Sequence, residues 1–138
     1  MNKVLRMFFL LFILAFILNL VWEIAHCNLY EHGKILNLSE KFAMALPASF
    51  GDAFYITLIY FITFILIRKN NLLWFSILSI SIAAVVEYIS VHLLGRWSYG
   101  PNMPIVFGIG FFPLIQLFVT GIISIIIIST FVKNKTRL

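Results

Sequence analysis

The segment MFFLLFILAFILNLVW, residues 7–22, contains no charged residue, and Lys3 and Arg6 precede it. The apolar character continues to about residue 27. A helix needs about 20 mostly apolar residues to cross the hydrocarbon core of a bilayer. We therefore expect a transmembrane helix over about residues 7–27. A basic start before an apolar run also fits a signal peptide, but no small-x-small cleavage site follows, so we expect this segment to be retained.

Three further crossings are predicted along the chain. One extends over about residues 49–67, entered through Pro47, and the next extends over about residues 72–94. The last uncharged stretch, residues 97–132, is too long for a single crossing. Its first half is rich in glycine and proline, which interrupt helices. We therefore expect a Gly/Pro-rich connector and then a fourth transmembrane helix over about residues 111–132.

The composition agrees with a membrane protein. Hydrophobic residues make up 62% of the 138 residues and charged residues 11%, whereas about 25% of an ordinary soluble domain is charged. This excludes a soluble globular protein and leaves room for one domain, residues 1–138. The sequence therefore predicts an all-α, polytopic membrane protein with four transmembrane helices in a compact bundle. Its single cysteine, Cys27, excludes an internal disulfide and a cysteine-built metal site.

The basic residues predict the topology, because lysine and arginine collect on the cytoplasmic side of membrane proteins. Four crossings place both termini and the second loop on one side. That side carries seven basic residues, and the other carries Lys34, Lys41 and Arg96. We therefore expect a multi-pass protein of the cytoplasmic (inner) membrane with both termini in the cytoplasm. This topology accounts for the net charge of +5, so no nucleic-acid partner is expected.

The acidic residues all fall in the outer loop or in the outer half of a predicted helix, on the side away from the termini. Each helix also carries one polar face at helical spacing. Such faces turn inward, because an unpaired polar group exposed to lipid costs several kcal/mol. We therefore expect a polar layer inside the outer half of the bundle. Its members are Asn19, Glu23, His26 and Tyr30 of the first helix, Asp52 and Tyr55 of the second, Glu87 of the third, and Gln116 and Thr120 of the fourth.

Carboxyl groups and a histidine in a layer of low dielectric suggest proton chemistry, because two nearby carboxylates cannot both ionise cheaply there. We expect Glu23 and Glu87 to act as an acid/base or binding pair, oriented by Asp52, His26 and Gln116. The catalytic candidates are thus Glu23, Glu87, Asp52 and His26. Alternatively, these groups only hold the helices together. Glu23-x-x-His26 has the spacing used in di-iron bundles, but only one such pair is present, so no metal and no other cofactor is expected.

The connector places a cation, aromatic faces and hydrogen-bond donors above the polar layer, in Arg96, Trp97, Tyr99 and Asn102. We expect Arg96, Trp97 and Tyr99 to engage the headgroup of an amphiphile. The ligand-binding candidates in or near the helices are Asn19, Tyr30, Tyr55, Gln116 and Thr120. His32 is expected to be solvated, and Lys41 is expected to be an ordinary loop charge.

Several short motifs lie along the chain: Asn19-x-x-Trp22-Glu23-x-x-His26, Gly51-Asp52, Glu87, Arg96-Trp97-x-Tyr99 and Pro113-Leu114-x-Gln116. In these residues the chain resembles small prokaryotic four-helix membrane proteins that have no assigned activity. The resemblance covers most of the chain and implies the architecture alone. A thinner similarity, in four spans with Trp, Glu and His facing a bundle cavity, is to the emopamil-binding sterol-isomerase group, and it favours lipid chemistry.

Two hypotheses about function follow from the sequence. In the first, a polar cavity in the outer half of the bundle binds a lipid or isoprenoid-like amphiphile, and isomerises it or otherwise transforms it by proton transfer. In the second, the protein is a non-catalytic assembly partner or structural subunit whose polar faces only pack the helices. The expected partners are membrane lipids or an amphiphilic small molecule in the first case, and a second copy or another membrane protein in the second. Whether the protein is an enzyme stays open between them.

Overall fold

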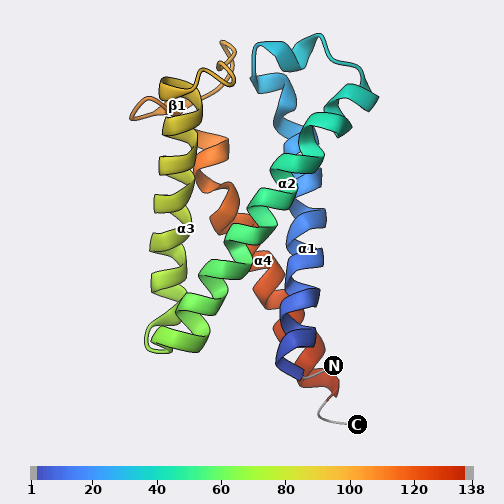
Figure 1. Ribbon diagram of the computed structural model, residues 1–138, viewed down its shortest axis with the longest axis vertical. Coiled ribbons are helices and arrows are strands. Elements are labelled where there is room, and N and C mark those ends of the chain that lie inside the picture. The colour runs from blue at the N-terminus through green and yellow to red at the C-terminus, as the bar shows by residue number, and fades with distance from the viewer. Residues whose placement is uncertain (1–2, 136–138) are drawn as a thin grey trace.

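The computed structural model describes residues 3–135. Four long helices dominate it: α1 (Lys3–His26), α2 (Leu38–Tyr60), α3 (Asn71–Tyr88) and α4 (Phe111–Lys135). Two π-helical segments continue α2 and α3, namely η3 (Phe61–Ile67) and η4 (Ile89–Leu93). All four helices are long and apolar enough to cross a membrane. The predicted all-α bundle of four membrane-spanning helices is therefore confirmed (Figure 1).

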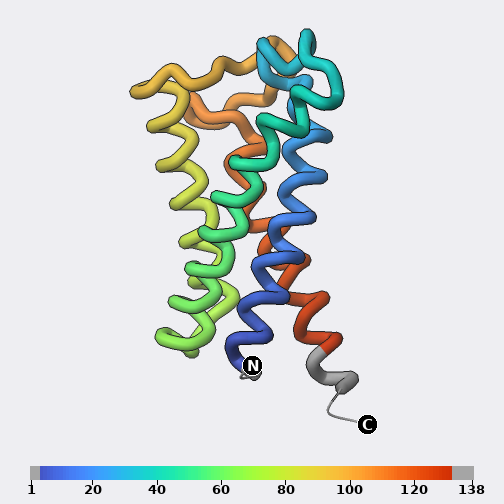
Figure 2. Tube along the Cα trace, turned by 45° about the vertical axis from the view of Figure 1, so that its right-hand side comes forward, coloured from blue at the N-terminus to red at the C-terminus, as the bar shows by residue number. Residues whose placement is uncertain are grey.

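The two ends of the bundle differ in the segments that they carry. Figure 1 places the start of α1, the end of α4 and the α2–α3 loop at one end, here called the terminal end. The α1–α2 loop and the connector between α3 and α4 lie at the other, the connector end. α1 packs along α2 and α4, and α3 packs along α4. α2 and α3 meet near the terminal end and diverge toward the connector end (Figures 1 and 2).

The core between the four helices is apolar. Phe75, Ile56 and Leu117 are buried there against alanines of α1, α2 and α3. Gly121 of α4 allows α3 to approach closely, because a Cβ at this position would lie 2.6 Å from Cζ of Phe75. Small residues at such contacts favour the association of membrane helices, since they let the backbones come together.

α2 begins well before the predicted start near Ser49. Asn37 and Glu40 form a capping box, in which Asn37 Oδ1 accepts from the Glu40 N–H at 3.0 Å and Glu40 Oε2 accepts from the Asn37 N–H at 2.8 Å. These bonds satisfy donors that a helix start leaves free, so the helix begins at Leu38. Pro47, expected at the entrance, lies inside the helix, where its missing N–H removes one helical hydrogen bond.

The connector is not helical, as its glycines and prolines predict. It contains a short antiparallel hairpin of β1 (Ile105–Val106) and β2 (Ile109–Gly110). Phe107 and Gly108 form the turn, and both have positive φ angles. α4 then begins at Phe111, where the sequence predicts it.

Candidate functional site

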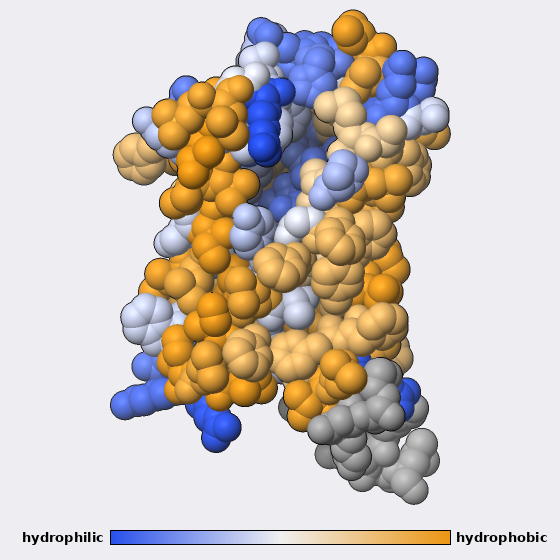
Figure 3. Space-filling model, in the orientation of Figure 1, coloured by the Kyte–Doolittle hydropathy of each residue, from blue (hydrophilic) through white to orange (hydrophobic). Residues whose placement is uncertain are grey.

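A cavity of about 470 Å³ lies in the connector half of the bundle, where α2 and α3 diverge. Figure 3 shows the corresponding hollow on the face turned toward the viewer, with hydrophilic residues inside it. Side chains from all four helices and from the connector line the cavity, among them Glu23, Asp52, Glu87, Trp97 and Gln116. The cavity therefore contains polar groups although the surrounding bundle surface is apolar.

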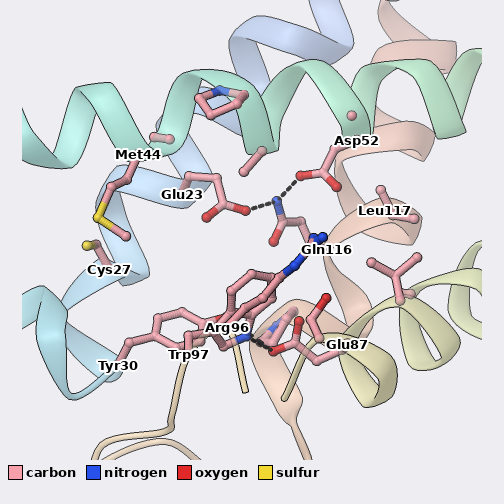
Figure 4. A pocket seen from close by; sticks show the side chains of 18 of the residues that line it. Glu23, Cys27, Tyr30, Met44, Asp52, Glu87, Arg96, Trp97, Gln116 and Leu117 are labelled. Carbon is pink, nitrogen blue, oxygen red and sulfur yellow. Dashed lines mark hydrogen bonds between the residues drawn. The ribbon is translucent and has the colours of Figure 1, made fainter. Parts of the chain in front are cut away.

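The amide of Gln116, near the start of α4, connects two of these carboxyl groups. Its Nε2 donates to Glu23 Oε1 at 2.8 Å and to Asp52 Oδ2 at 2.8 Å. The same nitrogen lies 3.1 Å from Asn19 Oδ1. One buried amide thus joins α4 to both α1 and α2, and the two carboxyl groups lie within two hydrogen-bond lengths of each other (Figure 4).

Asn19 fixes the orientation of the Gln116 amide. Asn19 Nδ2 donates to the Ala15 carbonyl at 2.8 Å, which leaves Oδ1 to face α4. Thr120 Oγ1 lies 3.2 Å from that oxygen and 2.7 Å from the Gln116 carbonyl oxygen. Because Asn19 Oδ1 accepts, Gln116 must present its NH₂ group on this side. The Gln116 Oε1 then has no donor within residues 3–135 and points into the cavity (Figure 4).

Glu87 of α3 is the centre of a second group of hydrogen bonds. Its Oε1 accepts from Tyr99 OH at 2.9 Å and from Trp97 Nε1 at 3.1 Å, while Tyr30 OH lies at 3.5 Å. Glu87 is 5% exposed, so its carboxyl group has lost most of its contact with water. The three donors take the place of that water. Two of the donors belong to the connector and one follows α1, so Glu87 ties both segments to α3.

Tyr30 and Tyr99 keep their protons at physiological pH. Both lie outside the membrane-spanning helices, and their backbones pair as an isolated β-bridge. Burial raises the pKa of both phenols above its ordinary value, and the Glu87 carboxyl group beside them raises the pKa further. The phenols therefore remain donors to Glu87.

Most of the predicted site residues converge on the cavity. Those that line it are Glu23, Tyr30, Asp52, Tyr55, Glu87, Arg96, Trp97 and Gln116. Three further predicted residues do not line the cavity but contact residues that do. Tyr99 forms a hydrogen bond with Glu87, and Asn19 and Thr120 form hydrogen bonds with Gln116. The roles assigned to these residues stay predictions.

His26 is placed differently from the expectation that it orients a carboxyl group. Its Nδ1 lies 2.6 Å from the Trp22 carbonyl oxygen, one helical turn earlier. Its Nε2 is buried and has no hydrogen-bond partner in the described part of the chain. His26 also does not line the cavity. In the described residues the ring therefore makes no hydrogen bond to a carboxyl group, because its Nδ1 binds the backbone of its own helix.

Two residues that the sequence-based boundaries leave in a loop line the cavity, although ordinary solvated roles are predicted for them. His32 and Lys41 both line it, and Lys41 Nζ donates to Asn28 Oδ1 at 2.6 Å. Lys41 lies in the first turns of α2, which the sequence-based boundary leaves in the loop. The capping pattern Asn37-x-x-Glu40 is the signal that could have found it.

The cavity holds charges of both signs that are not paired with one another. Glu23, Asp52 and Glu87 carry the acidic groups, and Arg96 and Lys41 carry the basic groups. Across residues 3–135 none of these acids forms an ion pair with a basic side chain, and the Arg96 guanidinium makes no hydrogen bond. These groups therefore have no ionic partner in the cavity and can meet a ligand.

No three His, Cys, Asp or Glu side chains in the described part of the chain are grouped so that they could hold a metal ion.

Comparison of the chain with protein-family models, with curated protein sequences and with solved structures finds no match. The resemblance to small prokaryotic four-helix membrane proteins thus stays an expectation from the sequence.

Proposed function

We propose that the protein binds a lipid or isoprenoid-like amphiphile in this cavity, and isomerises it or otherwise transforms it by proton transfer. The observation that supports this most is a cavity of about 470 Å³ lined by carboxyl groups from three helices. Ligand cavities in proteins typically measure about 300–1,000 Å³ and place a few polar groups in apolar surroundings.

The position of the cavity suits a ligand with a long apolar part. It lies where α2 and α3 diverge, and the apolar side chains of Met44, Ala48 and Val86 line it on these two helices. Met44 and Ala48 line the cavity on α2 and are exposed. A hydrocarbon chain can therefore leave between α2 and α3 toward the lipid while its polar end remains with the carboxyl groups.

The carboxyl groups occupy two places that suit an acid and a base. Glu23 shares the Gln116 amide with Asp52, whereas Glu87 is held by Trp97 and the connector. In a double-bond shift, one carboxyl group donates a proton to one alkene carbon while a carboxylate removes a proton from the allylic carbon attached to the other alkene carbon. The two transfers leave protons and charge balanced. Positioned acid–base groups typically contribute about 10²–10⁴-fold to a rate.

The Gln116 amide also supports a second function, that of a structural subunit. It links α1, α2 and α4 inside the bundle, and polar contacts of this kind hold membrane helices together. In that case the apolar outer surface would dock a second copy or another membrane protein, and the cavity would bind no ligand.

A bulky substitution in the cavity tests ligand binding. Ala43 and Ala48 are both exposed alanines of α2, but of the two only Ala48 lines the cavity. We expect Ala48→Trp to lower photo-crosslinking of a diazirine-bearing diacyl phospholipid or polyprenyl phosphate to cavity-lining peptides by about tenfold. Ala43→Trp should leave the crosslinking unchanged. Equal crosslinking in the two variants, measured by mass spectrometry of the peptides, would overturn ligand binding in favour of the structural function.

We further propose that the protein lies in the cytoplasmic membrane with both termini in the cytoplasm. The start of α1, the end of α4 and the α2–α3 loop share one end of the bundle, and six basic residues within residues 3–135 belong to these segments. In a Cys27→Ser background, Ser39→Cys should react with a membrane-impermeant maleimide on intact cells. Asn70→Cys should react only after the cells are opened. The opposite pattern would reverse the proposed orientation.

A further inference from the structure

The interior of the cavity offers acceptors that have no donors. Glu23 and Asp52 each accept through one oxygen, as does Glu87, which leaves their second carboxyl oxygens without a hydrogen bond in the described residues. Gln116 Oε1 also has no donor there, although Gln116 is 4% exposed. Glu23, Asp52, Glu87 and Gln116 all line the cavity, so water can reach these acceptors while the cavity is empty of ligand. A ligand that displaces this water leaves the acceptors unsatisfied unless it brings donors of its own.

The charges in the cavity are also separated along its depth. Asp52 lies about 16 Å farther along α2 than Lys41, at 1.5 Å per residue. Glu23 and Asp52, which share the Gln116 amide, are therefore deeper in the cavity than Lys41, which is near the connector end. Arg96 is exposed and reaches across the cavity in Figure 4. His32 is half-buried and follows α1 at the connector end. The cavity thus favours a positive group inside and a negative group at the opening.

We propose that the ligand is a phospholipid whose headgroup carries a primary ammonium group, an assignment that rests on the amphiphile binding proposed above and not on the proton transfer to carbon. The ammonium group donates to the free oxygens of Glu23, Asp52 and Gln116, and the phosphate contacts Arg96. The acyl chains leave between α2 and α3. A quaternary ammonium group carries the same charge but has no N–H to donate, so it leaves the free acceptors unsatisfied.

Lipid competition tests this assignment. The protein is reconstituted into vesicles of equal parts phosphatidylethanolamine, phosphatidylcholine and phosphatidylglycerol with identical acyl chains, and retained lipid is identified by native mass spectrometry. We expect phosphatidylethanolamine to be retained about tenfold over the other two, since charge-assisted hydrogen bonds are strong. Asp52→Asn should remove most of this preference. Glu31→Gln, which changes an exposed carboxyl group that does not line the cavity, should leave the preference intact.

A variant at Arg96 tests the contact with the phosphate. Arg96→Gln should lower the retention of all three lipids, because each carries the phosphate, whereas Arg6→Gln at the terminal end should not. An unchanged retention in Arg96→Gln would overturn the placement of the phosphate.

The lipid competition separates this assignment from the proposed function. Equal retention of the three lipids, abolished by Ala48→Trp, would overturn the ammonium assignment and leave amphiphile binding intact. A preference that Asp52→Asn does not change would also overturn the assignment. Retention that Ala48→Trp does not change would overturn both proposals, because the retained lipid would then lie outside the cavity.

Discussion

Replacing Gln116 with leucine is expected to lower the free energy of unfolding by about 2–4 kcal/mol. The amide donates to Glu23 and Asp52 at 2.8 Å each, and the leucine side chain has no donor. Two neighbouring carboxyl groups then lose their shared hydrogen-bond partner, and breaking a buried polar contact on one side leaves the other side unsatisfied.

Equilibrium unfolding in mixed micelles of a mild detergent and SDS measures this change. Ser124→Ala is the matched control, because Ser124 is equally buried but donates only to the Thr120 carbonyl of its own helix. It should cost less than about 1 kcal/mol. Adding Asp52→Asn to Gln116→Leu should recover part of the loss, because the asparagine amide can donate to Glu23. A cost for Gln116→Leu no larger than that of Ser124→Ala would show that the amide does not hold the helices together.

In the proposed function, replacing Glu87 with glutamine is expected to lower proton transfer to the amphiphile by about a hundredfold or more. Glutamine keeps the shape of the side chain and an oxygen that can accept from Tyr99 and Trp97. It cannot take up or release a proton at neutral pH, so an acid/base role is lost while the hydrogen bonds of the connector remain.

Deuterium incorporation measures the rate of proton transfer, because any product that gains a proton on carbon in D₂O carries deuterium there. The reconstituted protein is incubated in D₂O with a total lipid extract of the host membranes, and mass spectrometry follows deuterium on carbon. Glu31→Gln is the matched control, because Glu31 is exposed and does not line the cavity. Incorporation by Glu87→Gln at the wild-type rate would remove Glu87 from the chemistry. If the wild-type protein incorporates no deuterium, proton transfer is not its function.

The helices could be predicted from the sequence wherever the membrane requires a long uncharged stretch. Uncharged stretches of sufficient length locate α1, α3 and α4, because only a helix satisfies its own backbone in a bilayer. The start of α2 could not be found in this way. Its first turns carry the charged residues Glu40 and Lys41, and Pro47 is of a residue type that is common at helix starts. The boundary is instead set by the capping hydrogen bonds of Asn37.

The candidate site could be predicted as a layer of polar faces, but its pairings could not. Helical spacing shows that Glu23 and Gln116 face inward. It does not show that one amide serves both Glu23 and Asp52, because this depends on the depth at which α1, α2 and α4 pack. It also cannot show that His26 turns to the Trp22 carbonyl, since a ring on the polar face can reach its own backbone equally well.

The hydroxyl groups of the bundle have a consequence for the electrical insulation of the membrane. Ser49, Thr63 and Ser124 are fully buried, and each donates to a carbonyl one turn earlier in its own helix. None of the three donates to a neighbouring helix, so they do not form a proton wire. In the proposed function, protons therefore reach the carboxyl groups from the connector end, and their transfer moves no charge across the membrane.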